Sequence, residues 1–218
     1  MNIVLLGLPG AGKGTQAKNI RDKFGLHHIS TGDIFRKALE EETPLGMKAK
    51  EYMDEGKLVP DEITIGIMEN YVQDHTDEKG LVFDGFPRTL QQAEALAEIL
   101  AGIEGKVDLC IYIQVAEDEL IIRISGRRIC EDCGAIYHTE FNPPGEEGVC
   151  SKCGGSLYQR DDDREEIVRE RIKENREKTE ELIDYYRNQG VLEKVVGTGK
   201  MPEDVMEKVE KIVGEKIQ

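Results

Sequence analysis

Residues 7–15 read Gly-Leu-Pro-Gly-Ala-Gly-Lys-Gly-Thr, and this stretch decides how the rest of the chain is interpreted. It follows an apolar run at residues 3–6 and precedes a segment whose apolar residues recur at helical spacing. A strand, a glycine-rich loop and a helix in this order direct backbone N–H groups and the positive end of the helix into one concavity. Because Lys13 adds a mobile cation, the stretch predicts a site for the phosphates of a nucleoside triphosphate.

One position in this loop departs from the common pattern. Phosphate loops usually continue from the lysine into a serine or threonine that contacts magnesium, whereas here Gly14 follows Lys13 and the hydroxyl comes one residue later, at Thr15. The glycine spacing supports phosphate binding, and the displaced hydroxyl gives weaker support to a direct contact with magnesium. A tight turn with an incidental lysine is the alternative; the agreement of strand, glycine spacing and helix disfavours it.

The composition narrows the possible partners. The chain has 218 residues, with 29 Lys and Arg against 44 Asp and Glu, which gives a net charge of −15. Such a chain repels nucleic acid and anionic membranes, so anionic ligands require a local gathering of arginines. No apolar run approaches the ~20 residues that span a bilayer. The first apolar run has no basic leader, so we expect no signal peptide and a cytoplasmic protein.

Strand and helix patterns alternate along most of the chain. Continuous apolar or β-branched runs predict buried strands at residues 1–6, 28–29, 81–83, 109–115 and 192–196. Apolar residues at helical spacing over 63–72 and 90–100 predict helices between them. This alternation indicates an α/β fold with a parallel sheet, in which ligands bind at the carboxyl ends of the strands.

Two segments interrupt the alternation and are interpreted as inserted subdomains. Residues 31–60 contain two helical patterns without a strand between them, and Thr31 is a candidate cap for the first. Residues 128–160 contain four cysteines, several glycines and the pair Pro143-Pro144.

The four cysteines of the second segment form two C-x2-C pairs, Cys130 with Cys133 and Cys150 with Cys153. Their spacing is typical of a tetrahedral zinc site, and four thiolates leave no open position, so the metal is expected to be structural. Two disulfides are the alternative, which the lack of any sign of secretion disfavours. Because four cysteines complete the site, we do not expect His138 to be a zinc ligand. The fifth cysteine, Cys110, is expected to be a core residue.

An apolar strand at 81–83 ends in Asp84, which this topology places beside the phosphate loop. A carboxylate there is the expected partner of magnesium, directly or through water. Gly85 and Pro87 shape a turn that presents Arg88.

Other arginines suggest anion sites. Arg123 and Arg127 are four positions apart, which on a helix would place an anion between them, although a solvated basic face is the alternative. Arg171 shares a stripe with apolar residues, where an unpaired charge would be costly and a phosphate would pair with it. Arg160 stands at the far edge of the cysteine segment. Ordinary surface ion pairs are expected for Arg164, Arg169 and Arg176.

Together these motifs resemble the adenylate kinase family, in its long form with a zinc-binding lid. The resemblance covers essentially the whole chain and rests on residues 7–15, Ser30 to Asp33 with Arg36, residues 56–60, Asp84 to Arg88 with Gln92, residues 126–128, the cysteine pairs and Arg171. It implies a P-loop three-layer core at residues 1–30, 61–127 and 161–218. The helical AMP-binding insert would span residues 31–60 and the small β-rich zinc lid residues 128–160.

The resemblance also implies the reaction of Mg-ATP with AMP to give two ADP. It assigns the ATP phosphates to Gly10, Ala11, Gly12, Lys13, Gly14 and Thr15, and the rest of ATP to Arg123, Arg127, Ile136, Tyr137 and Gly199. It assigns AMP to Thr31, Arg36, Lys57, Leu58, Val59, Gly85, Phe86, Pro87, Arg88, Gln92, Arg160 and Arg171, with Gln92 as the adenine reader. Lys13, Asp84, Arg88, Arg123, Arg160 and Arg171 would be catalytic, and Asp33 and Asp84 would order magnesium and its waters.

The expected mechanism needs no general base, because the accepting phosphate oxygen of AMP is already anionic. Alignment, positive charge and a lid that excludes water would suffice. Two alternatives stay open: a kinase of the same fold that prefers UMP or CMP, and a nucleotide-gated module whose zinc ribbon holds RNA or a protein. The acidic charge disfavours the second. We expect a monomer with nucleotides as its only partners.

Overall fold

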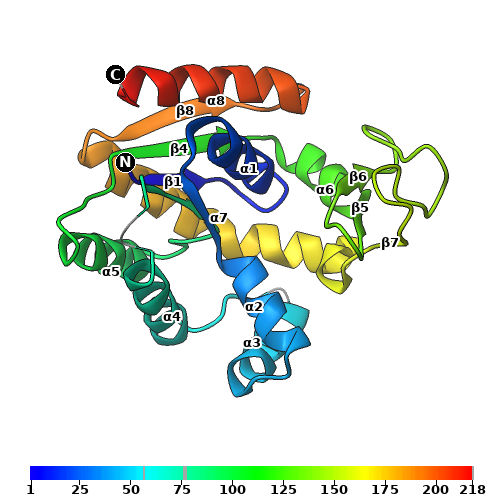
Figure 1. Ribbon diagram of the computed structural model, residues 1–218, viewed down its shortest axis with the longest axis horizontal. Coiled ribbons are helices and arrows are strands. Elements are labelled where there is room, and N and C mark those ends of the chain that lie inside the picture. Colours follow the sequence, from blue (N-terminus) through cyan, green and yellow to red (C-terminus); the bar gives the residue numbers. More distant parts are fainter. Residues whose placement is uncertain (56, 76–77, 218) are drawn as a thin grey trace.

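A computed structural model describes residues 1–55, 57–75 and 78–217 (Figure 1). Gly56, part of one motif quoted above, therefore lies outside the described residues. At the centre is a parallel sheet with strand order β2-β3-β1-β4-β8. Its strands are β1 (Ile3–Leu6), β2 (His27–Ser30), β3 (Leu81–Asp84), β4 (Leu109–Gln114) and β8 (Leu192–Val196). The strands that the sequence predicts are all present, and the α/β class is confirmed.

Helices cover both faces of this sheet (Figure 1). They are α1 (Lys13–Phe24), α4 (Asp61–Gln73), α5 (Leu90–Ala101), α6 (Glu117–Ser125), α7 (Glu165–Asn188) and α8 (Pro202–Ile217). Buried side chains of α1 and α8 form a cluster on one face, those of α4 and α5 form a second cluster on the other, and α7 contributes to both. The molecule therefore has three layers.

The central strand β1 shows why its sequence is apolar without interruption. Ile3 and Leu5 belong to the first cluster, whereas Val4 and Leu6 belong to the second. Successive side chains of a strand point to opposite faces, so a strand covered on both faces must be apolar at every position. The glycine-rich loop leaves this strand at its carboxyl end, which is the edge where ligands of such sheets bind.

The first insert consists of α2 (Thr31–Glu40) and α3 (Pro44–Asp54), which project away from the sheet (Figure 1). Our prediction that Thr31 caps α2 is wrong. Ser30 is the cap, because its hydroxyl accepts a hydrogen bond from the Asp33 N–H. Thr31 instead donates to the carbonyl oxygen of Gly85 at 2.9 Å, and this bond ties the insert to the turn after β3.

The second insert is a small antiparallel sheet of β5 (Arg127–Cys130), β6 (Ile136–His138) and β7 (Leu157–Tyr158), followed by the short helix η1 (Asp161–Asp163). The interpretation of Arg123 and Arg127 as neighbours on one helix is wrong. Helix α6 ends at Ser125, so Arg127 starts a strand instead of continuing the helical turn.

None of the helices in the described part of the chain is both long and apolar enough to span a membrane.

Gly46 allows α2 and α3 to approach closely. A Cβ at this position would lie 2.2 Å from the carbonyl oxygen of Ala38. Because backbone cannot yield as a flexible side chain does, we expect Gly46→Ala to destabilise the first insert by about 2 kcal/mol or more. Hydrogen exchange should become faster in α2 and α3.

Gly66→Ala is the matched control, because Gly66 lies inside α4 and nothing within 4 Å would meet its Cβ. That variant should gain about 0.5–1 kcal/mol of stability, since alanine has a higher helix propensity than glycine. Equal effects of the two substitutions would contradict the close approach at Gly46.

Candidate functional site

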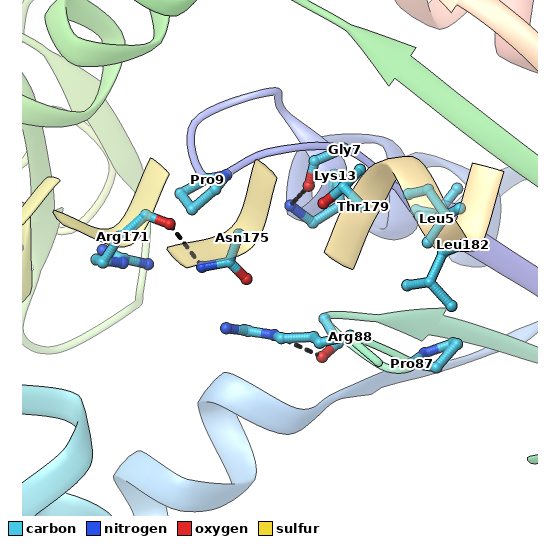
Figure 2. A pocket seen from close by; sticks show the side chains of 12 residues that line it. Leu5, Gly7, Pro9, Lys13, Pro87, Arg88, Arg171, Asn175, Thr179 and Leu182 are labelled. Carbon is cyan, nitrogen blue, oxygen red and sulfur yellow. Dashed lines mark hydrogen bonds between the residues drawn. The ribbon is translucent and has the colours of Figure 1, made fainter. Parts of the chain in front are cut away.

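The glycine-rich loop connects β1 to α1 at the carboxyl edge of the sheet. Helix α1 begins at Lys13, so the backbone N–H groups of its first turn have no partners within the helix and point towards the loop. Lys13 Nζ donates to the carbonyl oxygen of Gly7 at 2.7 Å (Figure 2). It also donates to the carbonyl oxygen of Leu8 at 3.1 Å. The ammonium group thus lies over the loop, where it can bind phosphate oxygens.

Lys13, Arg88 and Arg171 line one hollow beside this loop (Figure 2). Burial lowers the pKa of Lys13 to about 8 and that of Arg88 to about 10, although the nearby Asp84 carboxylate raises both. Burial also lowers the pKa of Arg171. Removing three cations from water is costly, and an anion bound among them offsets that cost. The hollow is therefore suited to phosphate groups.

Asp84 ends β3 beside the phosphate loop, as the sequence predicts. A Cβ at Gly14 would lie 3.1 Å from Asp84 Oδ2, so the glycine that replaces the usual hydroxyl residue makes room for this carboxylate. His28 Nε2 lies 3.5 Å from the same oxygen. Magnesium keeps several waters in protein sites, and a carboxylate in this position can accept hydrogen bonds from them.

Two acidic residues after the second insert hold arginines of the site. Arg127 Nε donates to Asp163 Oδ2 at 2.8 Å, and Arg171 Nη1 lies 2.9 Å from Asp162 Oδ2. Asp163 is fully buried. Burial lowers the pKa of Arg127, but the bond to Asp163 and the negative charges of Asp163, Asp162 and Asp33 together outweigh burial, and the pKa is raised. The partner that we expected a buried Arg171 to need is thus supplied within the chain.

No sequence pattern predicts a role in the site for these acids or for Asn175, which lines the hollow and donates to the backbone oxygen of Arg171 at 2.6 Å. The available signal was the run of aspartates at 161–163 directly before a long helix. A run of like charges is usually a solvated surface, and its pattern does not reveal that two of the three side chains turn inward. Surface pairs are confirmed for Arg164, Arg169 and Arg176.

Arg160, at the end of the second insert, reaches the first insert. Its Nη2 lies 3.7 Å from Asp33 Oδ1, and Arg36 donates to the same oxygen. Arg160 Nε is buried and has no hydrogen-bond partner among the described residues. A buried donor without a partner is uncommon, so this N–H marks a place where a ligand can supply an acceptor.

The turn after β3 gathers several of the predicted residues. Arg88 Nε donates to the carbonyl oxygen of Gly85 at 2.8 Å, the same oxygen that accepts the Thr31 hydroxyl. Gln92 is buried in the first turn of α5. Phe86 is also buried, and Pro87 lines the hollow.

The predicted residues 57–59, at the end of the first insert, differ in their exposure. Val59 is buried in the core of the first insert, whereas Lys57 is exposed and paired with Glu55. Leu58 between them is half-buried.

Arg123 and Gly199 lie together but apart from the hollow. Glu119 joins them, because one of its carboxylate oxygens accepts from Arg123 and the other from the Gly199 N–H at 2.8 Å. Arg123 also donates to the carbonyl oxygen of Gly197 at 2.9 Å. Ile136 and Tyr137 lie on β6 of the second insert, with Ile136 exposed. Arg123 is therefore not among the residues that line the hollow with Lys13.

The four cysteines of the second insert converge on one point. Their sulfurs lie within 4.8 Å of one another, and all are free thiols, so the disulfide alternative is overturned. Cys130 and Cys153 sulfurs are 3.4 Å apart, and those of Cys133 and Cys150 are 3.6 Å apart. Thiolates around a tetrahedral metal at 2.3 Å are about 3.8 Å apart, so the cluster fits one metal ion.

Two other expectations about this region are confirmed. His138 does not join the cluster, because its ring nitrogens bond to the backbone of Ile122, Glu140 and Phe141. Cys110 is a buried core residue on β4.

Comparisons with known proteins agree on one family. A family model described as adenylate kinase matches residues 5–191 of the chain. The adenylate kinase of Archaeoglobus fulgidus is 54% identical over 218 residues, which are 100% of both chains. Those of Geobacillus sp. and Bacillus licheniformis are each 55% identical over 197 residues, or 90% of this chain and 91% of each relative.

The lowered pKa of Lys13 predicts how phosphate binding depends on pH. Because the charged amine binds phosphate and is lost as the pH rises through about 8, we expect magnesium-free ATP to bind more weakly above that pH. The loss should approach about tenfold per pH unit. Calorimetry on the full chain measures it. Lys13→Arg is the control, because its guanidinium stays charged and its affinity for ATP should not fall above pH 8. If the affinities of both proteins fall in parallel as the pH rises, the deprotonating group is not Lys13.

The cysteine cluster predicts one thiophilic metal ion per chain, measured by elemental analysis. Cys153→Ser should lose the ion and lower the melting temperature by about 5 °C or more, since the metal closes a sheet with few apolar residues. Cys110→Ala, outside the cluster, should keep it. If the metal-free protein stays folded at low temperature but no longer binds nucleotide, the metal belongs to the nucleotide site instead.

Proposed function

The chain belongs to the adenylate kinase family and is a phosphotransferase that acts on ATP and AMP, and from that premise we propose which residues carry out the transfer. Residues 10–15, with Arg123, Arg127, Ile136, Tyr137 and Gly199, bind ATP. AMP is bound by Thr31, Arg36, residues 57–59, residues 85–88, Gln92, Arg160 and Arg171. The observation that carries this proposal is the hollow lined by Lys13, Arg88 and Arg171 next to the phosphate loop.

Transfer through this hollow depends on alignment and charge. The accepting oxygen of AMP is already anionic, so no side chain has to remove a proton from it. The transferring phosphoryl group spreads negative charge over its oxygens, and Lys13, Arg88 and Arg171 stabilise that charge more strongly because they are buried. Arg160, at the end of the second insert, joins them as a further catalytic residue when that insert approaches the core, and Arg123 on α6 of the core is another.

Asp84 and Asp33 order magnesium through its waters in this proposal. The place of Asp84 beside Gly14 supports the first assignment. Asp33 lies at the start of α2, where Arg36 and Arg160 hold its carboxylate. Magnesium, when bound, neutralises charge on the phosphates of ATP.

The inserts at residues 31–60 and 128–160 act as an AMP-binding domain and a lid on a core of residues 1–30, 61–127 and 161–218. They flank the phosphate loop from two sides (Figure 1). Four thiolates complete the coordination sphere of zinc, so the metal has no open position for substrate or water. Zinc therefore stiffens the lid and takes no part in the chemistry. Lid closure excludes water, which would otherwise accept the phosphoryl group.

The acidic charge of the chain supports small nucleotides as partners rather than nucleic acid or anionic membranes. We include in the proposal that the protein works as a monomer in the cytoplasm. The family and the names of the relatives do not favour a UMP or CMP kinase.

A coupled assay across AMP, UMP, CMP and GMP tests the proposal. We expect kcat/KM for AMP to exceed that for each other monophosphate by about a hundredfold or more, because the adenine edge is read by hydrogen bonds. A preference for UMP or CMP would overturn it, and salt-sensitive retention of RNA without phosphoryl transfer would favour the binding-module alternative.

Arg171→Ala tests the arginine cluster. Removing one buried cation from the transferring phosphoryl should lower kcat by about a thousandfold, with a smaller effect on the melting temperature. Arg169→Ala is the matched control on the same helix, because Arg169 makes an exposed pair with Glu165. A loss of stability with normal kcat would show that Arg171 is only a structural partner of the acids.

A further inference from the structure

We propose that Asp61 fixes the carboxamide of Gln92 in one orientation and thereby sets the preference for adenine over a 6-oxopurine. This inference rests on the proposed role of Gln92 as the reader of the AMP base. It adds a positioning residue to the site, since Asp61 acts on the base only through Gln92.

Three short hydrogen bonds hold the carboxamide and its partner. Gln92 Nε2 donates to Asp61 Oδ1 at 2.7 Å, and Gln92 Oε1 accepts from the Arg88 N–H at 2.7 Å. The other oxygen of Asp61 accepts from the Thr89 hydroxyl, also at 2.7 Å. The nitrogen and the oxygen of the carboxamide therefore each have a partner of the opposite kind.

Asp61 also lies where its negative charge is favourable. It is in the first turn of α4, directly after the first insert, and its partner Thr89 caps α5. Both helix ends carry partial positive charge, which stabilises a carboxylate between them. An ionised carboxylate only accepts hydrogen bonds, so it discriminates between the two ends of the Gln92 carboxamide.

Turning the carboxamide by half a rotation would create two mismatches. Its oxygen would face the Asp61 carboxylate, and its NH2 group would face the Arg88 N–H. Gln92 is 2% exposed, so water cannot relieve either mismatch. The observed orientation is thus favoured by two buried contacts, and Asp61 supplies the one that involves a charge.

The orientation matters because the base edge has a polarity. Gln92 keeps one N–H and one oxygen lone pair unused by these bonds. Adenine offers a 6-amino donor beside the N1 acceptor, which fits the carboxamide as oriented. Hypoxanthine offers a 6-oxo acceptor beside an N1–H donor, which fits only the turned carboxamide. Asp61 therefore acts against IMP as much as for AMP.

The test compares kcat/KM for AMP and for IMP, with ATP as donor, in the full chain. Asp61→Ala should lower the AMP-to-IMP ratio by about tenfold or more, the effect of losing one hydrogen bond to a charged group. Glu62→Ala removes an exposed charge from the same first turn and should leave the ratio unchanged. Asp61→Asn should also lower the ratio, because the oxygen of its amide can keep the Thr89 bond while its NH2 group faces Gln92 and favours the turned carboxamide.

Gln92→Ala separates the inference from its premise. If Gln92→Ala lowers the ratio and Asp61→Ala does not, Gln92 reads the base without Asp61 and the inference is overturned. If Gln92→Ala leaves both the ratio and kcat/KM for AMP unchanged, Gln92 does not read the base and the premise falls with it. Should Asp61→Ala not fold, Asp61→Ser, too short to reach both partners, takes its place with the same expectation.

Discussion

Positive charge buried inside an acidic chain is the constraint on which the site depends. The net charge is −15, yet Lys13, Arg88 and Arg171 are buried around one hollow. An ion removed from water costs several kcal/mol unless a partner is close. Carboxylates of the chain offset part of that cost. The N-terminus of α1 at the phosphate loop increases it, because a helix N-terminus carries partial positive charge. Under the proposed function a polyphosphate would supply the missing negative charge, so the same burial that weakens the fold locally would give the site its affinity for that ligand.

The central sheet is what makes that gathering possible. Leu5 of β1 pairs with Asp84 of β3, and Leu6 with Tyr112 of β4. Parallel strands end at one edge, so the loop after β1 and the turn after β3 emerge side by side although nearly eighty positions separate them. Helix α7 then crosses this edge and adds Arg171 from a third part of the chain.

Local sequence patterns predicted the parts of this arrangement that local forces determine. The strands, the phosphate loop and the paired cysteines follow from a few neighbouring residues, and each is where the pattern places it. Long-range pairings were different. The spacing of Arg123 and Arg127 predicts that Arg127 continues the helix, but α6 ends at Ser125 and Arg127 instead pairs with Asp163, 36 positions away. A periodic pattern contains no information about which distant carboxylate a buried arginine will meet, and so Asp163 and Asp61 emerged only from the fold.

The partners of these arginines bear on how the inserts can move. Glu119 holds Arg123 and Asp163 holds Arg127, while Asp33 lies between Arg36 and Arg160. Carboxylate and phosphate offer arginine similar paired oxygens. Under the proposed function, a nucleotide that takes the place of such a carboxylate would exchange one ion pair for another instead of forming a new pair from two hydrated charges. Such an exchange would cost least at Asp33, whose exposed carboxylate can return to water, whereas displacing the fully buried Asp163 would leave an unpaired charge inside the protein.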